Sequence, residues 1–160
     1  MAYTHAKVPT GGAKITVEGG KLQVPDRPIV PFIEGDGTGP DIWRASVRVM
    51  DAAVQKASNG KKKIHWHEVL AGEKAFNKTG QWMPENWKDA VGGHDAIFFG
   101  ATGWPALVPD HLSLWNSLIK FRRDFDQYVN LRPVKLVPGI PCPLAGRKPG
   151  DIDYFVVREN

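Results

Sequence analysis

The spacing of apolar positions along the chain alternates between two residues, which is typical of strands, and three to four residues, which is typical of helices. Two short alternating stretches, residues 14–17 and 21–24, flank Gly19 and Gly20, which predicts a β-hairpin. Residues 29–33 form an apolar run interrupted by Pro31 and predict a strand that ends in a glycine-rich turn. A helix is expected to start at Pro40, because proline suits the first helical turn. Its buried face is predicted from a three-and-four spacing of Ile42, Ala45, Val49 and Ala53.

The middle of the chain repeats the alternation of strand and helix. Residues 64–70 predict a second strand, with Ile64, Trp66, Glu68 and Leu70 on one side. A polar connection then leads to a weak helix that begins near residues 83–85. Residues 95–100 are continuously apolar after Asp95, as in a parallel strand covered on both faces. This order predicts an α/β fold.

The strongest helical pattern lies in the last third of the chain. It steps by four and three along one face, through Leu114, Leu118, Phe121, Phe125 and Tyr128. Residues 129–137 predict a strand in which Pro133 must stand at an edge or a bulge. Residues 138–149 are a proline-rich connection, and residues 152–157 predict a last strand.

Composition narrows the class of protein. The chain has 160 residues, of which 42% are hydrophobic, and its formal net charge is only +4. Its one basic run, residues 61–63, is expected to be a solvated turn, so we expect no nucleic-acid partner. The single cysteine, Cys142, excludes an intramolecular disulfide framework and favours a reducing, cytoplasmic setting. No stretch has the length of a signal peptide or a membrane span, so no membrane partner is expected.

The glycine-rich turn reads Glu-Gly-Asp-Gly-Thr-Gly-Pro at residues 34–40. It is not a dinucleotide fingerprint, because the sixth position of that pattern is Pro40 instead of glycine, and it lacks the Gly-Lys-Ser/Thr of a phosphate-binding loop. On physical grounds a sharp turn onto a helix is favoured over a phosphate cradle.

The same heptapeptide resembles the opening signature of the isocitrate, isopropylmalate and tartrate/D-malate dehydrogenase family. Residues 13–88 resemble a bacterial isocitrate dehydrogenase, whereas residues 94–160 resemble tartrate/D-malate dehydrogenases. The resemblance implies the N-terminal portion of the isopropylmalate dehydrogenase-like α/β fold, which is not a Rossmann fold, and an incomplete chain. We expect an N-terminal extension over residues 1–28, the first part of a large domain over 29–128, and the start of a small domain over 129–160.

Three arginines stand in segments similar to those that supply substrate-binding arginines in this family: Arg122, Arg132 and Arg158. Guanidinium groups bind carboxylates through paired hydrogen bonds, so converging arginines suit a di- or tricarboxylate. Separation in sequence cannot show convergence, and the alternative is three unrelated surface arginines. By the same resemblance, the residues that read the rest of the substrate are Trp115, Asn116, Leu118 and Ile119. Leu118 cannot donate a hydrogen bond to an extra carboxylate, which favours a small substrate, although Trp115, Leu118 and Ile119 could instead be core.

The resemblance implies oxidative decarboxylation of a 2-hydroxy acid with NAD or NADP and with Mg²⁺ or Mn²⁺. It places Thr102 and Gly103 near the nicotinamide, but the metal ligands and proton-transferring residues beyond Asn160, so no catalytic residue is expected within this chain. It also implies a homodimer when the protein is complete. D-malate or tartrate is the preferred substrate class; the alternatives are isocitrate, and a non-catalytic fragment that keeps an anion-binding arginine cluster.

Other polar residues are weaker candidates. His65 and His67 share one side of a predicted strand, where two histidines without a third ligand are more often surface residues than metal ligands. Asp36 and Asp41 are expected to serve the turn and the helix start. The carboxylates that precede the last strand are expected to lie in a solvated turn. We also expect exposed sheet edges and apolar faces, and therefore weak stability or association, for the isolated chain.

Overall fold

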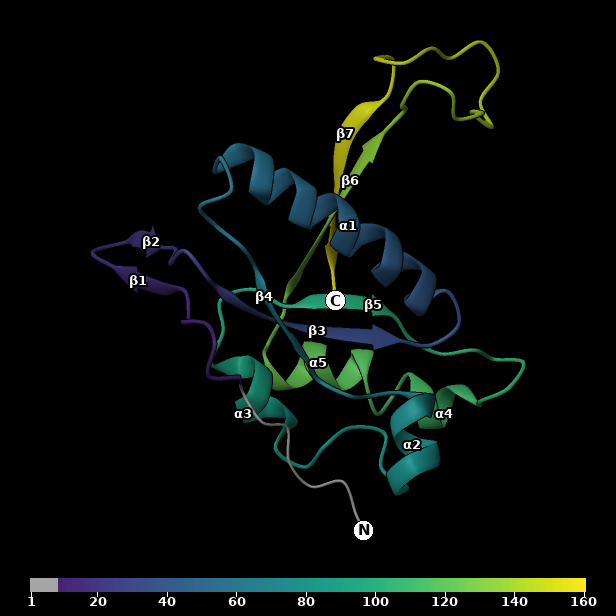
Figure 1. The fold of residues 1–160 in the computed structure, drawn as a ribbon. Coiled ribbons are helices and arrows are strands. Elements are labelled where there is room, and N and C mark those ends of the chain that lie inside the picture. Colours follow the sequence, from purple (N-terminus) through teal and green to yellow (C-terminus); the bar gives the residue numbers. More distant parts are fainter. Residues whose placement is uncertain (1–8) are drawn as a thin grey trace. The chain divides into compact units, whose positions relative to one another are not determined.

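The computed structural model describes residues 9–160 and has the mixed α/β content that the sequence predicts (Figure 1). The chain divides into two compact units, Met1–Lys120 and Phe121–Asn160. The first unit contains a small hairpin, a three-stranded sheet and most of the helices. The second contains a long two-stranded ribbon. Helix α5 (Leu118–Asp124) spans the division.

The predicted hairpin is confirmed as β1 (Thr16–Glu18) and β2 (Lys21–Gln23), which pair antiparallel across the two glycines. The glycines at its turn have φ values of 58° and 77°, which suit a tight connection. The hairpin is joined to the sheet by an isolated bridge between Ala13 and Pro28.

The central sheet has the order β4-β3-β5, and all its strands are parallel. Its strands are β3 (Ile29–Gly35), β4 (His65–Glu68) and β5 (Phe98–Ala101). Helix α1 (Gly39–Ala57) connects the first two of these strands. Two short helices, α2 (Glu73–Thr79) and α3 (Trp87–Gly92), lie between β4 and β5. Helix α2 was not predicted, because its seven residues fall in a segment that reads as a polar connection.

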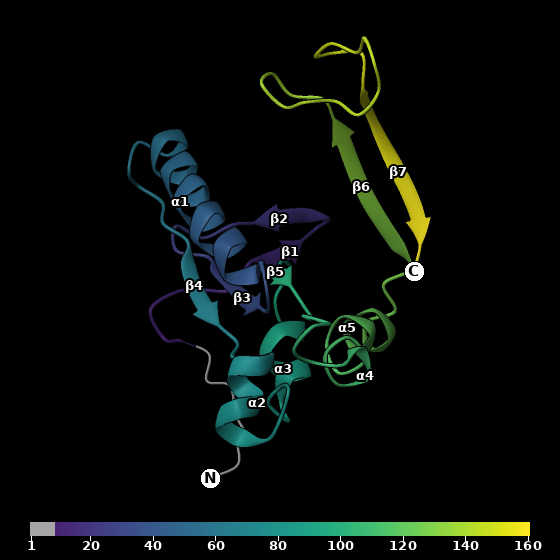
Figure 2. The same cartoon turned by 90° about the vertical axis from the view of Figure 1, so that its right-hand side faces the viewer.

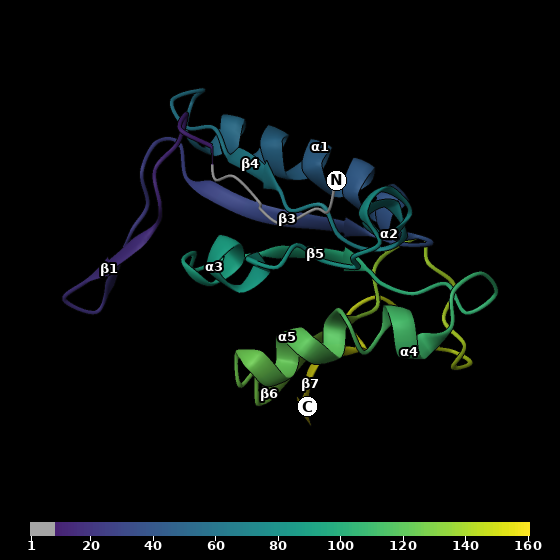
Figure 3. The same cartoon turned by 90° about the horizontal axis from the view of Figure 1, so that it is seen from below.

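Helix α1 lies over one face of the sheet (Figures 1 and 3), and aromatic side chains join the two. Trp43 stacks on Phe32 with ring centroids 3.8 Å apart. Its ring centroid lies 5.0 Å from that of Trp66, with the two planes nearly perpendicular, and 5.2 Å from that of Phe98, with the planes tilted. The indole N–H of Trp66 donates to Asp51 Oδ1 at 3.0 Å. Each such aromatic pair contributes about 0.5–1.5 kcal/mol beyond its buried area.

The sequence-based prediction of which face of α1 is buried is wrong. Ile42 is 42% and Val49 is 69% exposed, and Ala45 and Ala53 are exposed as well. The helix carries a second apolar stripe on its other side, and the large ring of Trp43 belongs to that stripe. Since the sheet presents aromatic rings to the helix, packing selects the stripe that bears the tryptophan.

The opposite face of the sheet holds the most deeply buried apolar residues. Pro31, Ile33 and Val69 are almost completely buried there, and Val91 of α3 and Pro84 are buried to the same degree. This side of the sheet is therefore the main core of the first unit.

The second unit is built on β6 (Val129–Lys135) and β7 (Asp153–Glu159), which pair antiparallel along their whole length (Figure 2). Pro133 lies opposite Phe155. In an antiparallel pair only alternate residues bond to the partner strand, so a ribbon accepts a proline at a position that is not bonded.

The long helix predicted over residues 114–128 is wrong in extent. Only α4 (Asp110–Ser113) and α5 are helical in this part of the chain. Helix α5 ends because Asp126 adopts a left-handed conformation with φ 48°. The N–H groups of Gln127 and Asp126 then bond to the carbonyls of Arg122 and Arg123, the pattern of a Schellman cap. A local cap thus ends a helix whose apolar spacing continues to Tyr128.

Candidate functional site

The strand register of the ribbon brings two of the three predicted arginines together. Asn130 lies opposite Arg158, and Arg132 lies opposite Val156. Side chains that face each other across antiparallel strands project to the same side, and side chains alternate along each strand. Arg132 and Arg158 therefore share one face of the ribbon as diagonal neighbours, with Cα atoms roughly 7–8 Å apart.

The third arginine, Arg122, is half-buried in α5 and lies near the other two. Burial lowers the pKa of Arg122, and the positive charges of Arg158 and Arg132 lower it further. A guanidinium group nevertheless keeps its charge in proteins. All three predicted side chains thus belong to one compact unit and lie near enough for their charges to act on one another.

Within residues 9–160, none of the three guanidinium groups forms an ion pair with a carboxylate. Arg132 Nε donates only to Asn130 Oδ1, at 3.3 Å. Three mutually repelling cations without a counter-ion from the chain are costly to keep together. Such an arrangement is suited to a polyanionic ligand.

Two asparagines frame this cluster and were not singled out from the sequence. Asn130 Nδ2 donates to Asn160 Oδ1 at 3.2 Å, and Asn160 Nδ2 donates to the Gln127 carbonyl at 2.6 Å. The N–H of Asn160 also donates to the Tyr128 carbonyl. These bonds tie the end of β7 to the segment that follows α5. Their proximity to Arg132 and Arg158 in sequence was the available signal.

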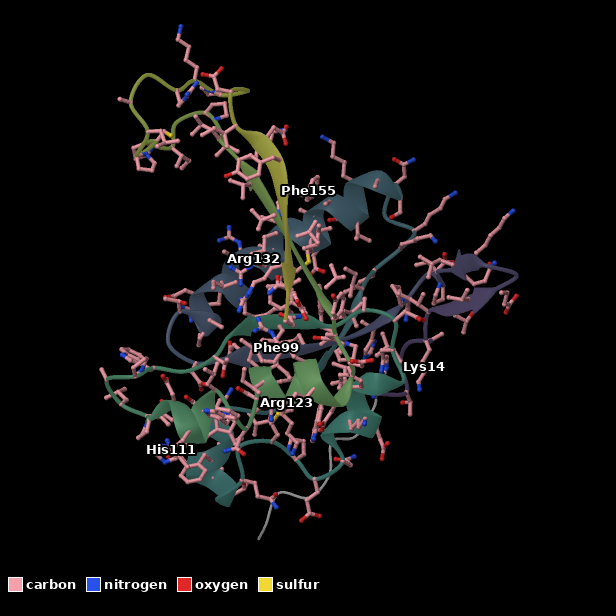
Figure 4. All side chains as sticks on the ribbon, turned by 180° about the vertical axis from the view of Figure 1, so that it is seen from behind. Lys14, Phe99, His111, Arg123, Arg132 and Phe155 are labelled. Carbon is pink, nitrogen blue, oxygen red and sulfur yellow. The ribbon has the colours of Figure 1, made fainter. Side chains whose placement is uncertain are left out.

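The other face of the ribbon is apolar in its middle and carries the Lys135–Asp153 pair at one end and Glu159 at the other. Leu131, Phe155 and Val157 lie on this face and are 56%, 62% and 69% exposed. Figure 4 marks Arg132 and Phe155, which belong to the two different faces. One face of the ribbon therefore carries the two arginines, and the opposite face carries a central apolar patch.

The residues predicted to contact the rest of the substrate lie in the first unit, at the start of α5 and just before it. Trp115 is 54% exposed, so the alternative that it is core is wrong. Leu118 and Ile119 are half-buried. Asn116 Nδ2 donates to the Leu112 carbonyl at 2.9 Å, so its amide nitrogen is used within the chain.

Thr102 and Gly103 lie beside the glycine-rich turn, held by Asp36. The Gly103 N–H donates to Asp36 Oδ2 at 3.1 Å, and Thr102 Oγ1 lies 2.7 Å from Ser117 Oγ. Asp36 serves the turn as predicted, since its carbonyl accepts the Gly39 N–H, and its side chain, 6% exposed, is also bonded to other loops. The Thr102 hydroxyl and the Gly103 N–H are already bonded within the chain. A ligand at this loop would therefore be contacted through the shape of the loop and not through these two donors.

The interpretation of the strand histidines as surface residues is wrong for His67, which is 5% exposed. Burial lowers the pKa of His67, and His65 lowers it further. Burial also lowers the pKa of His94, as do Lys14 and His67, while the Val91 carbonyl and Asp95 act in the opposite direction. His67 Nε2 is buried without a hydrogen-bond partner among the described residues.

The remaining charged candidates have structural roles. Asp41 pairs with Arg44 in the first turn of α1, and Lys62 of the basic run lies 3.8 Å from Asp26. Asp151 Oδ2 caps a turn by accepting the Lys148 N–H, whereas Asp153 lies in β7 and pairs with Lys135 at 2.9 Å.

In the part of the chain that the structure describes, no three His, Cys, Asp or Glu side chains lie together as metal ligands would. No helix of residues 9–160 has both the length and the hydropathy needed to cross a membrane. Cys142 is a free thiol.

Comparison with known protein families gives a match to the isocitrate/isopropylmalate dehydrogenase model over residues 29–160. The chain belongs to this family. The match covers the glycine-rich turn, the central sheet and all three arginines of the ribbon site.

Curated relatives from several bacteria are similar over most of the chain. A D-malate dehydrogenase [decarboxylating] of Escherichia coli is 51% identical over 138 residues, which cover 82% of this chain and 36% of that protein. A tartrate dehydrogenase/decarboxylase of Pseudomonas putida is 49% identical over 133 residues, 82% of this chain and 35% of that protein. An NADP isocitrate dehydrogenase of Staphylococcus aureus is 44% identical over 147 residues, 92% of this chain and 33% of the relative. The chain thus spans about a third of the length of these relatives.

Solved structures support the fold assignment. A beta-decarboxylating dehydrogenase from Thermococcus kodakarensis matches with a TM-score of 0.53 and 28% identity, over 82% of this chain and 33% of its own. A protein from Thermus thermophilus matches with a TM-score of 0.63 and 26% identity, over 91% and 28% of the two chains. The predicted fold, part of the isopropylmalate dehydrogenase-like α/β architecture, is confirmed.

Proposed function

We propose that this chain supplies the substrate-anchoring part of an NAD(P)-dependent dehydrogenase that oxidatively decarboxylates a small 2-hydroxy acid of the D-malate or tartrate type. The observation that carries this proposal is the convergence of Arg122, Arg132 and Arg158 without a carboxylate partner within residues 9–160. A dicarboxylate would balance two of the three positive charges of this cluster through paired, charge-assisted hydrogen bonds.

In this proposal the arginines orient the substrate. Two fixed carboxylates leave the hydroxyl-bearing carbon in one position, and such positioning lowers the barrier to a bimolecular transfer. The nicotinamide, when bound, accepts a hydride from that carbon. The family chemistry also implies Mg²⁺ or Mn²⁺, but the described residues offer no ligand set for either ion, so we assign no step to a metal held by this chain.

The choice of a small substrate rests on Leu118 and on the names of the relatives. Leucine cannot pair with a third carboxylate, and an unpaired charge against an apolar side chain is unfavourable. Two of the relatives are named for D-malate and tartrate. Isocitrate is the second candidate, favoured by the 44% identity to an isocitrate dehydrogenase over 92% of the chain.

The wider organisation is also proposed from the family. Residues 1–28 would be an N-terminal extension, 29–128 the first part of a large domain, and 129–160 the start of a small domain. The complete protein would be a cytoplasmic homodimer. A binding fragment without turnover is the remaining alternative, because the arginine cluster alone suffices to hold an anion.

Calorimetric titration of the 160-residue chain with D-malate, tartrate and isocitrate, with and without Mg²⁺ or Mn²⁺, tests the proposal. We expect D-malate or tartrate to bind more tightly than isocitrate. Replacing Arg158 by Gln should weaken binding at least roughly tenfold, because hydrogen bonds to charged groups are worth about 1.5–3 kcal/mol. The matched variant Arg147→Gln, in the exposed connection of the same unit, should leave binding unchanged.

Absence of binding at millimolar concentration, or an equal loss in the Arg147 variant, would contradict the substrate-anchoring role. The 160-residue chain is expected to hold no catalytic residue, so turnover is tested on the complete protein. Adding NAD⁺ or NADP⁺ to it and following absorbance of the reduced cofactor separates the two remaining cases. Binding with turnover supports the enzyme, whereas binding without turnover identifies an anion-binding fragment.

A further inference from the structure

Asp36 lies where three segments of the first unit meet. Its Oδ1 accepts the N–H of Glu73 at 2.8 Å, and its Oδ2 accepts the N–H of Gly103 at 3.1 Å. The donors are 37 and 67 residues away in sequence. Asp36 is only 6% exposed, so water competes little for these bonds. One carboxylate therefore links the glycine-rich turn, the start of α2 and the loop that follows β5.

The backbone around Asp36 is shaped for these contacts. Gly72 has φ 84°, and a Cβ atom on it would lie 2.4 Å from Asp36 Oδ1. Gly35 has φ 83°, and a Cβ there would lie 1.7 Å from the Ala101 carbonyl oxygen. Only glycine permits both the conformation and the close approach at these two positions. Gly35 in the turn and Gly72 before α2 thus let the carboxylate approach the amides of its partners.

Two hydroxyl groups extend the network. Thr102 Oγ1 lies 3.4 Å from Asp36 Oδ2 and 2.7 Å from Ser117 Oγ, and Ser117 Oγ lies 2.6 Å from the Ser113 carbonyl. Each hydroxyl has one proton to donate. The two short distances are satisfied when Ser117 donates to Ser113 and Thr102 donates to Ser117. The network then runs from the loop after β5 to the residue immediately before α5.

We propose that Asp36 is a positioning residue that sets the place of the Thr102–Gly103 loop for the nicotinamide of the proposed reaction. This inference rests on the proposed function, since that function is what brings a nicotinamide to the loop. Asp36 touches neither substrate nor cofactor in this role. It acts by holding the Gly103 amide directly, while the hydroxyl of Thr102, bonded to Ser117, fixes the neighbouring residue of the same loop.

Amide hydrogen exchange on the 160-residue chain tests the positioning role. In Asp36→Asn one carboxylate oxygen becomes an NH₂ group, which cannot accept a hydrogen bond, and exchange at the Gly103 or Glu73 amide should then rise at least roughly tenfold. The Val69 amide, which donates to the Phe32 carbonyl in the same sheet, should keep its rate. Asp41→Asn makes the same chemical change at an exposed residue on the other side of the turn and should alter neither amide.

Exchange that rises equally at Gly103, Glu73 and Val69 would mean general loosening and would overturn the proposal, as would rapid exchange of both amides in the unchanged chain. If Asp36→Asn does not fold, a second pair of variants decides the matter. Thr102→Ser keeps the hydroxyl and should keep Gly103 protected, whereas Thr102→Val should raise its exchange. Equal behaviour of these two variants would overturn the proposal.

Reduced nicotinamide mononucleotide serves as the probe of the cofactor link. It should shift the Gly103 amide resonance of the unchanged chain, and this shift should weaken in Asp36→Asn but persist in Asp41→Asn. No shift in the unchanged chain would count against the proposed function and the nicotinamide role together. The exchange rates would still decide, by themselves, whether Asp36 holds the loop.

Discussion

The sheet unit and the ribbon unit treat their charged groups in opposite ways. In the sheet unit the buried carboxylate of Asp36 takes its hydrogen bonds from the chain's own amides. In the ribbon unit Arg122, Arg132 and Arg158 stand near one another with no carboxylate partner among the described residues. A charged group that is hydrogen-bonded within the chain stabilises the local backbone structure. Charged groups that lack a partner in the chain indicate a site for a ligand of opposite charge.

The two units also differ in how deeply their apolar residues are buried. Ile33, Val69 and Val91 are almost fully buried in the sheet unit, whereas Phe155 and Val157 of the ribbon are more than half exposed. A two-stranded ribbon is at best marginally stable in water by itself. Stability therefore resides in the sheet unit, and the candidate binding chemistry resides in the ribbon. This agrees with the weak stability or association that we expect of the isolated chain.

The largest expected effect separates two phenylalanines. Phe32→Ala removes a buried ring that stacks on Trp43, and it should lower the free energy of unfolding by about 3–5 kcal/mol. Phe155→Ala removes a ring that is 62% exposed and should change stability by less than about 0.5 kcal/mol. Urea denaturation of both variants measures the difference. Equal losses would mean that the ribbon is as well packed as the sheet unit.

Acidification should weaken the sheet unit next. The folded state lowers the pKa of His67 and His94 below the ordinary 6.5, so folding favours their neutral forms. The associated stability is complete above pH 6.5 and is lost as the pH falls below that value toward the lower folded-state pKa values. Once protonated, His67 would be repelled by His65 and by His94. Protonated His94 would also be repelled by Lys14, and Asp95 would partly compensate its charge.

Urea midpoints measured about one pH unit above, at and below the ordinary histidine pKa of roughly 6.5 check this expectation. His94→Gln should flatten the dependence on the acid side, while the exposed control His111→Gln should not. A midpoint that stays constant over this range would show that the buried histidines do not govern acid stability.

A smaller effect concerns geometry at constant charge. Arg158→Lys keeps the positive charge but loses the planar fork, so D-malate binding should weaken by about three- to tenfold, less than in Arg158→Gln. Calorimetric titration of both variants gives the two affinities. If lysine restores full affinity, the cluster acts as a diffuse field and not through paired hydrogen bonds.

The smallest expected change in stability comes from Arg132→Gln, which should stabilise the ligand-free chain and weaken ligand binding. Arg132→Gln removes one of three mutually repelling charges, so the ligand-free chain should gain up to about 0.5 kcal/mol while binding weakens. Thermal unfolding at low and high salt measures this, since salt should erase the gain. A loss of ligand-free stability in low salt would show that Arg132 contributes to folding.

Local chemistry made several elements predictable. The hairpin across Gly19 and Gly20 depends on residues close in sequence, and so does the strand that leads into the glycine-rich turn. The family could be anticipated from the heptapeptide of residues 34–40 and from the arginine segments. These features need no knowledge of what packs against them.

Elements whose outcome depends on a distant partner were predicted less well. Helix α1 carries two apolar stripes, and only the rings of Phe32, Trp66 and Phe98 select the one with Trp43. The helix expected to reach Tyr128 ends early, because Asp126 takes a left-handed conformation that apolar spacing does not report. Burial of His67 depends on which side of β4 the core covers.

By itself, the amino-acid order determined the succession of strands and helices and the residues that could bind a polycarboxylate. Tertiary structure alone decided that Arg132 and Arg158 share a face, because that follows from the pairing of β6 with β7. It also decided that Asp36 meets the amides of Glu73 and Gly103. Both are contacts between groups far apart along the chain, and such contacts arise only when the backbone has closed the loops between them.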